Sequence, residues 1–417
     1  MKNNLTAEEL LLTGCLKAVL CKKPWKIETV VETVKPDGAV WSKMLQLAKG
    51  HAVLPLLCDG LLESPDVPAA VQAEARLAGR QCGLQSYRLL FMTKTLVDLL
   101  EQSGVPVLVL KGAVVASYYP VPELRKAGDI DLLIPEKEKF SQACKILSEN
   151  GLFRQDEPTV DYHISFETDE HIKVELHKAL SEPFENRRMN YCLQAFLTNL
   201  KHKITWKSTV TDVLLPVLPD AEMAFYLLIH MLRHFLRSGF GLKLLADWVV
   251  FWNREIDENE KVQFMGYVRE SGLCGFCAAV TQACVCYLGL RPENAEFMAV
   301  QELSGADVME FFREVMEAQE FGLTDKTRMV VLPGTGPGAY FCEFHYQMKI
   351  RYPRAGKVFL LWPVLWGMTL FHFVRNNKKL RRVSSCGIIR KAGMRSRILK
   401  KIHLFQDVPK RDEKRAP

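Results

Sequence analysis

The chain has 417 residues, 48% of them hydrophobic, which is enough for two or three packed domains and excludes a largely disordered protein. The net charge of +7 is uneven: residues 375–417 carry 15 Lys or Arg and three acidic residues, which leaves about −5 for the rest. The basic character therefore belongs to the tail, and no specific nucleic-acid binding is expected. Twelve scattered cysteines and the lack of a cleavable apolar signal sequence after Met1 lead us to expect reduced thiols in a cytoplasmic protein.

Residues 1–103 predict a helical region without recognisable chemistry. Apolar residues recur at helical spacing over residues 5–22, 40–62 and 67–103. His51 lies in this region, where we expect a packed or surface histidine rather than a ligand.

Residues 104–215 have the pattern of a compact α/β core. Short apolar or alternating runs predict strands, two of them joined by the turn around Asp169-Glu170, and longer amphipathic runs predict helices. The predicted strands are 105–110, 129–134, 163–168 and 172–176, and the predicted helices are 113–119 and 136–150.

Residues 216–375 predict a helical carboxyl-terminal domain. Residues 376–417 form a basic tail, in which we expect a short helix. The helical patterns cover residues 221–236, 242–252, 262–290 and 297–320. The Gly-rich stretch at 333–338 predicts a flexible loop, and it lacks the Lys-Ser/Thr ending of a P-loop.

The stretch 358–374 is unusually apolar. Its 17 residues fall at the lower limit for a membrane span, which needs ~20, and they include Pro363 and Gly367. We expect a buried or surface-docking helix. The basic residues that follow leave peripheral contact with an anionic membrane open.

Two aspartates alternate with apolar residues in the predicted strand 129–134. Residues two apart in a strand point to the same side, so Asp129 and Asp131 should stand side by side. Such carboxylates repel each other unless a cation lies between them or one takes a proton. Hard oxygen ligands of this kind suit Mg²⁺ bound to nucleotide phosphates. Two exposed acids at a strand end are the alternative.

Companion residues favour a phosphate site and a third carboxylate. Gly112 follows a buried strand and begins a helix, where the backbone can approach a phosphate closely. Glu175 stands between apolar residues of a later strand and can complete a site for two divalent ions, although an acid of an edge strand has the same pattern. Lys111 and Arg125 can supply positive charge to a triphosphate.

Together these motifs resemble the DNA polymerase β-like nucleotidyltransferase superfamily, in which a strand, a Gly-Gly or Gly-Ser pair, a helix, an Asp-x-Asp/Glu strand and a later acidic strand recur. They are more similar to a large bacterial family of nucleotidyltransferases of uncharacterised substrate, often found among polysaccharide-biosynthesis genes. The residues that carry the resemblance are Leu110-Lys111-Gly112, the stretch from Arg125 to Leu133, the stretch from Val174 to His177, and then His230, His234, Gly239, Gly241, Leu242, Lys243 and Asp247. There are three departures: Ala113 stands where the superfamily has serine, Lys243 stands where the family has arginine, and the gap from Gly112 to Asp129 is longer than in the minimal enzymes.

The resemblance implies an α+β fold, with a small mixed-sheet, polymerase β-like core embedded in a mainly α-helical chain. It implies transfer of a nucleoside monophosphate from an NTP, such as ATP, to an unidentified acceptor hydroxyl or amine, with release of pyrophosphate. A sugar, a small metabolite, a protein hydroxyl and a nucleic-acid end all stay open as acceptors. Two Mg²⁺ ions would be held by the catalytic residues Asp129, Asp131 and Glu175. The nucleotide would be bound by Lys111, Gly112, Ala113 and Arg125, and the substrate or a ligand carboxylate would be contacted by His177, His230, His234, Lys243 and Asp247.

Simpler alternatives stay open for several of these residues. His230 and His234 are four residues apart, but no Glu or Cys nearby completes a zinc site, and a satisfied core pair is equally expected. Asp247 is expected to pair with Arg233 or Lys243. For the chain as a whole, the alternative is a non-catalytic adaptor or regulator that retains the fold in an envelope-polysaccharide or peptide-modification system.

Overall fold

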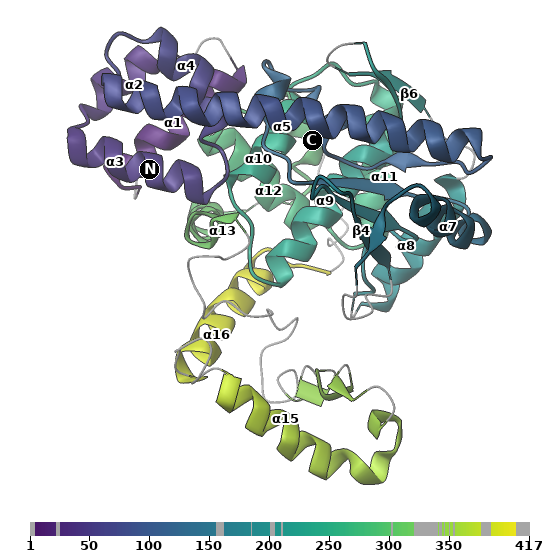
Figure 1. The fold of residues 1–417 in the computed structure, drawn as a ribbon. Helices are drawn as coiled ribbons and strands as arrows, with labels where there is room; N and C mark the ends of the chain where they lie inside the picture. The colour runs from purple at the N-terminus through teal and green to yellow at the C-terminus, as the bar shows by residue number, and fades with distance from the viewer. Residues whose placement is uncertain are drawn as a thin grey trace, which may run out of the picture.

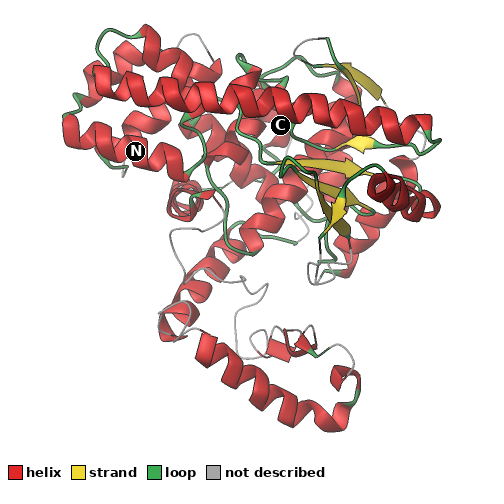
Figure 2. Ribbon diagram, in the orientation of Figure 1, coloured by secondary structure: helices red, strands yellow, loops and turns green. Residues whose placement is uncertain are grey.

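The computed structural model contains a seven-stranded mixed sheet surrounded by helices (Figure 1). It describes residues 5–21, 26–155, 162–184, 186–200, 205–209, 212–301, 303–320, 355–376 and 385–405, together with part of 341–352. Figure 2 shows the strands gathered in one part of the molecule, with helices around them and in the rest of the chain. The expected mixed sheet within a mainly helical chain is therefore confirmed.

The sheet has the strand order β3-β4-β5-β2-β1-β7-β6. Two pairs, β2–β5 and β1–β7, are parallel, and the other neighbours are antiparallel. The strands are β1 (Leu108–Val109), β2 (Asp129–Leu133), β3 (Phe153–Arg154), β4 (His163–Glu167), β5 (Lys173–His177), β6 (Thr205–Ser208) and β7 (Leu214–Val217). The strand expected over 105–110 is shorter than predicted, and β3, β6 and β7 were not predicted.

The amino-terminal region is helical, as expected. Its helices are α1 (Ala7–Cys21), α2 (Ile27–Val34), α3 (Gly38–Gly50), α4 (Cys58–Glu63) and α5 (Ala69–Gln102). The 34-residue helix α5 crosses the whole body and packs on β2 and β7 (Figure 1). α4 can cross α5 closely because Gly79 has no side chain: a Cβ there would lie 2.6 Å from Cys58 Sγ.

The remaining helices follow the predicted order, except that α8 was not predicted and the run 262–290 is divided. They are α6 (Ala113–Ala116), α7 (Phe140–Glu149), α8 (Arg187–Leu200), α9 (Asp220–Leu236), α10 (Leu242–Trp252), α11 (Glu258–Glu270), α12 (Cys274–Tyr287), α13 (Gly305–Ala318), α15 (Trp362–Asn376) and α16 (Ser385–Lys401). The helical pattern expected over 262–290 is divided between α11 and α12, which Gly272 separates with a φ of +73°. The predicted loop at 333–338 lies outside the described residues.

One hydrophobic core unites the regions. Its buried members run from Leu5 in the amino-terminal region to Leu404 after α16, and α9 to α13 supply the largest share. In the part of the chain that the structure describes, no helix has the length and apolar character needed to cross a bilayer. Because strand and helix residues share this core, the sheet and the helices form one continuous body.

Candidate functional site

Neighbouring strands build a polar face at the centre of the sheet. β2 and β5 are parallel, and their register pairs Asp129 with Lys173 and Asp131 with Glu175. Paired residues on neighbouring strands point to the same face, so Asp131 and Glu175 stand side by side. β4 continues this face with Ser165, which is opposite Glu175.

Asp131 is the buried centre of the cluster, with 2% of its surface exposed. Its Oδ1 lies 3.2 Å from His177 Nε2, and its Oδ2 lies 3.2 Å from Lys111 Nζ. His177 Nε2 is also 3.5 Å from Glu175 Oε2, so the imidazole links the two carboxylates. Lys111 Nζ is 3.8 Å from Asp129 Oδ2 and links the two aspartates.

These groups set one another's protonation. Burial would raise the pKa of Asp131, but the Lys111 charge and the His177 hydrogen bond outweigh it and lower that pKa. The charge of Asp131, and then burial, raises the pKa of Asp129. Burial would lower the pKa of His177, but its hydrogen bonds to Asp131 and Glu175 raise it. Asp131 is thus held in its ionised form, whereas Asp129 accepts a proton more readily.

Asp131, Glu175 and His177 can hold a metal ion, because their ligand atoms all lie within 4.8 Å of one another. Within the described residues, this is the one such group of three His, Cys or acidic side chains. Two of the three predicted carboxylates therefore converge directly. Asp129 lies outside the group and faces Lys111, whereas His177 is part of it.

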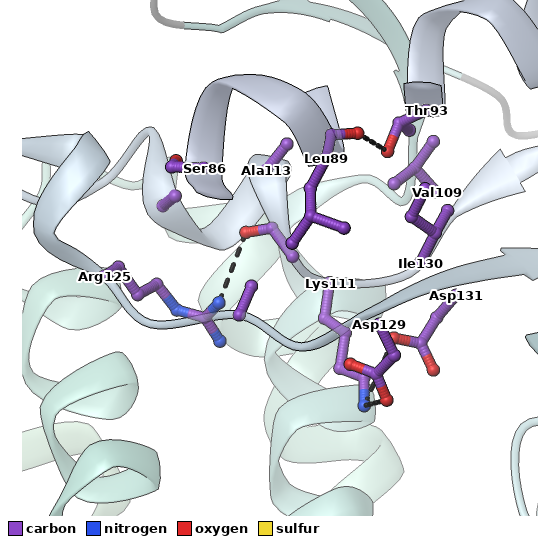
Figure 3. A pocket seen from close by; sticks show the side chains of 13 residues that line it. Ser86, Leu89, Thr93, Val109, Lys111, Ala113, Arg125, Asp129, Ile130 and Asp131 are labelled. Atoms are coloured by element: carbon purple, nitrogen blue, oxygen red, sulfur yellow. Dashed lines mark hydrogen bonds and ion pairs between the residues drawn. The ribbon is translucent and has the colours of Figure 1, made fainter. Parts of the chain in front are cut away.

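The turn at Lys111 and Gly112 lies beside the aspartates (Figure 3). Gly112 has a φ of +66° and a ψ of −116°, a conformation that side-chain-bearing residues rarely adopt. Ala113 follows as the first residue of α6. A small pocket at the turn is lined by Ser86, Leu89 and Thr93 of α5 on one side, and by Lys111, Gly112, Asp129 and Asp131 on the other.

A buried ion pair lies behind this turn. Arg125 Nε and Nη2 donate to the two carboxylate oxygens of Asp247 at 2.7 and 2.8 Å, and both side chains are almost fully buried. Tyr119 Oη donates to Asp247 Oδ1 at 2.6 Å. Arg125 Nη1 donates to the Gly112 carbonyl at 3.3 Å (Figure 3). Asp247 therefore neutralises the guanidinium that the sequence assigned to the triphosphate, and the same guanidinium holds the Gly112 turn.

The expected pairing of Asp247 with Arg233 or Lys243 is wrong. Lys243 Nζ lies 2.9 Å from Glu320 Oε1, and Arg233 Nη2 lies 3.2 Å from Glu182 Oε1. The sequence favoured cations close to Asp247 in the chain, whereas its arginine partner lies 122 positions away.

His230 and His234 lie on the same side of α9, with ring centroids 4.6 Å apart in an edge-to-face arrangement. Burial, helped by the charge of Lys111 and other cations, lowers the pKa of His234 to about 3 and that of His230 well below its usual range. Both rings are therefore neutral at physiological pH. They face the charge of Lys111 and are not part of the metal-capable group.

Tyr226 is a site residue that the sequence analysis missed. It lies one turn before His230 on α9, with ring centroids 6.0 Å apart. Burial raises the pKa of its hydroxyl. The charge of Lys111 lowers this pKa, and the carboxylates of β2 and β5 raise it further. Tyr226 is four residues before His230, just as His230 is four residues before His234. The same helical spacing could therefore have identified it.

Lys173 and His163 were missed as well. Lys173 Nζ lies 2.9 Å from Glu175 Oε1, and strand alternation from Glu175 could have found it. His163 is opposite His177 across β4 and β5, and the ring centroids are 5.2 Å apart. No signal within the sequence of β4 indicates that pairing.

A family model described as an uncharacterised nucleotidyltransferase matches residues 37–289, which is more than half of the chain. The matched range contains the carboxylate cluster, the Gly112 turn and α9. A search of the curated proteins found no match.

Proposed function

The chain belongs to the family of uncharacterised nucleotidyltransferases, and on that premise we propose that it moves a nucleoside monophosphate from an NTP to an acceptor hydroxyl or amine. The acceptor atom bonds to the α-phosphorus, the bond between that phosphorus and the bridging oxygen of the β-phosphate breaks, and pyrophosphate leaves. The proton of the acceptor passes to Glu175 and then to solvent.

The observation that carries the proposal is the register of β2 and β5. It sets Asp131 beside Glu175, with Lys111 and His177 in contact. Burying four ionisable groups of mixed sign together is costly for a fold. Such clusters, with pKa values shifted in both directions, concentrate at functional sites.

The donor set fits a divalent cation. Asp131 Oδ2 is buried and has no hydrogen-bond partner, with only the charge of Lys111 beside it. We propose that Asp129, Asp131 and Glu175 hold Mg²⁺, two ions in the full complex, and that His177 keeps two of these carboxylates in position. When bound, the cation would neutralise the departing pyrophosphate and favour deprotonation of the acceptor.

Lys111 and Gly112 are proposed to bind the triphosphate. Without nucleotide, the Lys111 ammonium offsets the charge of Asp129 and Asp131. We propose that it moves to the β- and γ-phosphates when an NTP binds at the adjacent Gly112 turn. These phosphates carry a higher density of negative charge than the two aspartates. A Cβ added to Gly112 would meet only the Asp129 carbonyl within 4 Å, at 3.8 Å, so a phosphate can approach the backbone there.

The acceptor is proposed to bind between the carboxylates and α9. Tyr226, His230 and His234 offer aromatic faces and neutral hydrogen-bonding groups at successive turns of this helix. Such a surface suits the rings and hydroxyls of a sugar or small metabolite. Glu175 is ionised there, since His177 and Lys173 outweigh the effect of burial and lower its pKa.

The test is transfer of label from each α-labelled NTP, with Mg²⁺ and a cell extract as the source of acceptor. Wild type should give a labelled product that disappears with EDTA and in Asp131→Ala. Asp169→Ala is the matched control, because Asp169 is an exposed acid in the turn between β4 and β5. Equal labelling by wild type and Asp131→Ala would remove the assignment of activity to this site.

Two observations favour a second function, that of a non-catalytic adaptor or regulator. Lys111 already lies between the two aspartates, where a metal cation would bind, and Ala113 lacks the phosphate-binding hydroxyl of the superfamily. In that case, neither NTP nor a divalent cation binds in equilibrium dialysis, and no labelled product forms with any of the variants.

A further inference from the structure

The helix α15 and the turn before it expose an apolar surface outside the body. Figure 1 shows α15 standing away from the sheet and its surrounding helices, on the far side of α16. Of the 19 large hydrophobic side chains that are exposed among the described residues, eight lie within residues 358–371. They are Val358, Phe359, Leu360 and Leu361 at the 3-10 turn η8 (Phe359–Leu361), and Val364, Met368, Leu370 and Phe371 on α15.

One side of α15 is already covered within its own segment. Leu365 and Thr369 are buried, and the rings of Trp362 and Trp366 pack against His345. The outward side of α15 carries Val364, Met368 and Phe371, which have the spacing of one helical stripe, and Leu360 of η8 extends this stripe at its amino-terminal end. The side chains of this stripe are exposed to solvent, although residues of this type are usually buried in a hydrophobic core.

The charge around this stripe is all of one sign. From residue 344 to residue 406 the sequence contains 15 Lys or Arg and no Asp or Glu. Lys357 and Arg375 flank the stripe at either end and are exposed. Apolar side chains between cations are the pattern of a helix that lies in the interface of an anionic bilayer.

We propose that η8 and α15 form a peripheral docking element for a membrane surface rich in anionic lipid. The aliphatic and aromatic stripe enters the boundary between headgroups and acyl chains, and the flanking cations bind lipid phosphates. A second copy of the chain fits less well, since it would bring two segments of the same strong positive charge together. Nucleic acid would leave the aliphatic stripe in water.

The docking element is tied to the body through α16. Arg395 is 1% exposed, and its Nε lies 2.7 Å from Glu314 Oε1 on α13. Its guanidinium also donates to the carbonyls of Phe235 and Arg237 at the end of α9. Membrane docking would therefore hold the body, with its candidate site, close to the bilayer and to acceptors anchored there.

The experiment is co-sedimentation of the full chain with vesicles of phosphatidylcholine alone or with added phosphatidylglycerol. Wild type should bind the anionic vesicles. Leu360→Asp/Phe371→Asp should bind them at least about tenfold more weakly. Leu84→Asp/Val262→Asp is the matched control, since both residues are at least 70% exposed on helices of the body. It adds the same two charges and should bind as wild type does.

Three results would overturn the proposal. The first is that wild type does not bind anionic vesicles, and the second is that Leu360→Asp/Phe371→Asp binds them as well as wild type does. The third is a wild-type dimer in light scattering that the same double variant dissociates, because the stripe would then be covered by a second copy. Should circular dichroism show that the double variant is unfolded, Lys357→Glu/Arg375→Glu takes its place and should also bind more weakly.

Discussion

Asp247→Ala is expected to lower the free energy of unfolding by about 3–5 kcal/mol, the usual cost of removing one partner of a buried ion pair. The structure places this case within that range. Arg125 is almost fully buried and loses two hydrogen bonds of 2.7 and 2.8 Å. Tyr119 loses the acceptor of its 2.6 Å hydrogen bond as well, and an unsatisfied buried hydroxyl costs about 1–3 kcal/mol. The two costs overlap because they share one carboxylate.

Guanidinium chloride unfolding followed by circular dichroism measures the change. The control is Tyr119→Phe/Arg125→Met/Asp247→Leu, in which every member of the network is replaced by an apolar side chain of similar size. This variant should come within about 2 kcal/mol of wild type, because it leaves no charge or hydroxyl buried without a partner. A loss below about 1 kcal/mol in Asp247→Ala, or an equal loss in both variants, would refute the reasoning.

The same variants separate stability from function. Arg125 donates to the Gly112 carbonyl, so loss of the arginine or of its counter-ion should loosen the Gly112 turn. The triple variant should therefore be stable yet bind NTP about tenfold more weakly. Wild-type affinity in this variant would show that the turn keeps its shape without Arg125.

Three further outcomes are expected. Lys111→Met removes the cation beside Asp131, so nucleotide-free affinity for Mn²⁺, measured by calorimetry, should rise about tenfold while NTP affinity falls. Burial lowers the pKa of His51 to about 3, whereas the pKa of a histidine in the unfolded chain is about 6.5. Between these two pH values the unfolded state binds one more proton than the folded state. The free energy of unfolding therefore falls as the pH drops from about 6.5 towards 3. His51→Asn should reduce that slope of unfolding free energy by about 1.4 kcal/mol per pH unit, and an unchanged slope would contradict the assignment. Gly112→Ala should cost about 1–2 kcal/mol because of its positive φ, whereas Gly83→Ala, in open space on α5, should gain up to about 1 kcal/mol in the same unfolding assay.

Elements with a long, regular burial pattern could be predicted from the sequence. α9 and α10 match the predicted ranges to within one residue, because the residues that face the core recur at helical spacing over three or more turns. β4 and β5 were found by their alternation and by the polar turn between them. Short edge strands such as β6 were missed because four residues carry too little pattern.

The site could be predicted as a list of residues but not as an arrangement. Asp131 and Glu175 were each recognisable from their strands, whereas their pairing depends on the register of two parallel strands that are distant in sequence. The position of Lys111 between the aspartates could not be read from the chain, because a flexible side chain settles according to charges that only the fold assembles. The partner of Asp247 was missed for the same reason.

The guanidinium of Arg395 at the end of α9 also has a consequence for the order of synthesis. The carbonyls that it binds belong to Phe235 and Arg237, which leave the ribosome 160 and 158 residues before it. Throughout that interval, these two carbonyls lack the Arg395 donor. A chain interrupted before α16 would thus contain every proposed site residue, but its α9 would end without this donor. Synthesis is almost complete before the last turn of α9 receives its permanent donor.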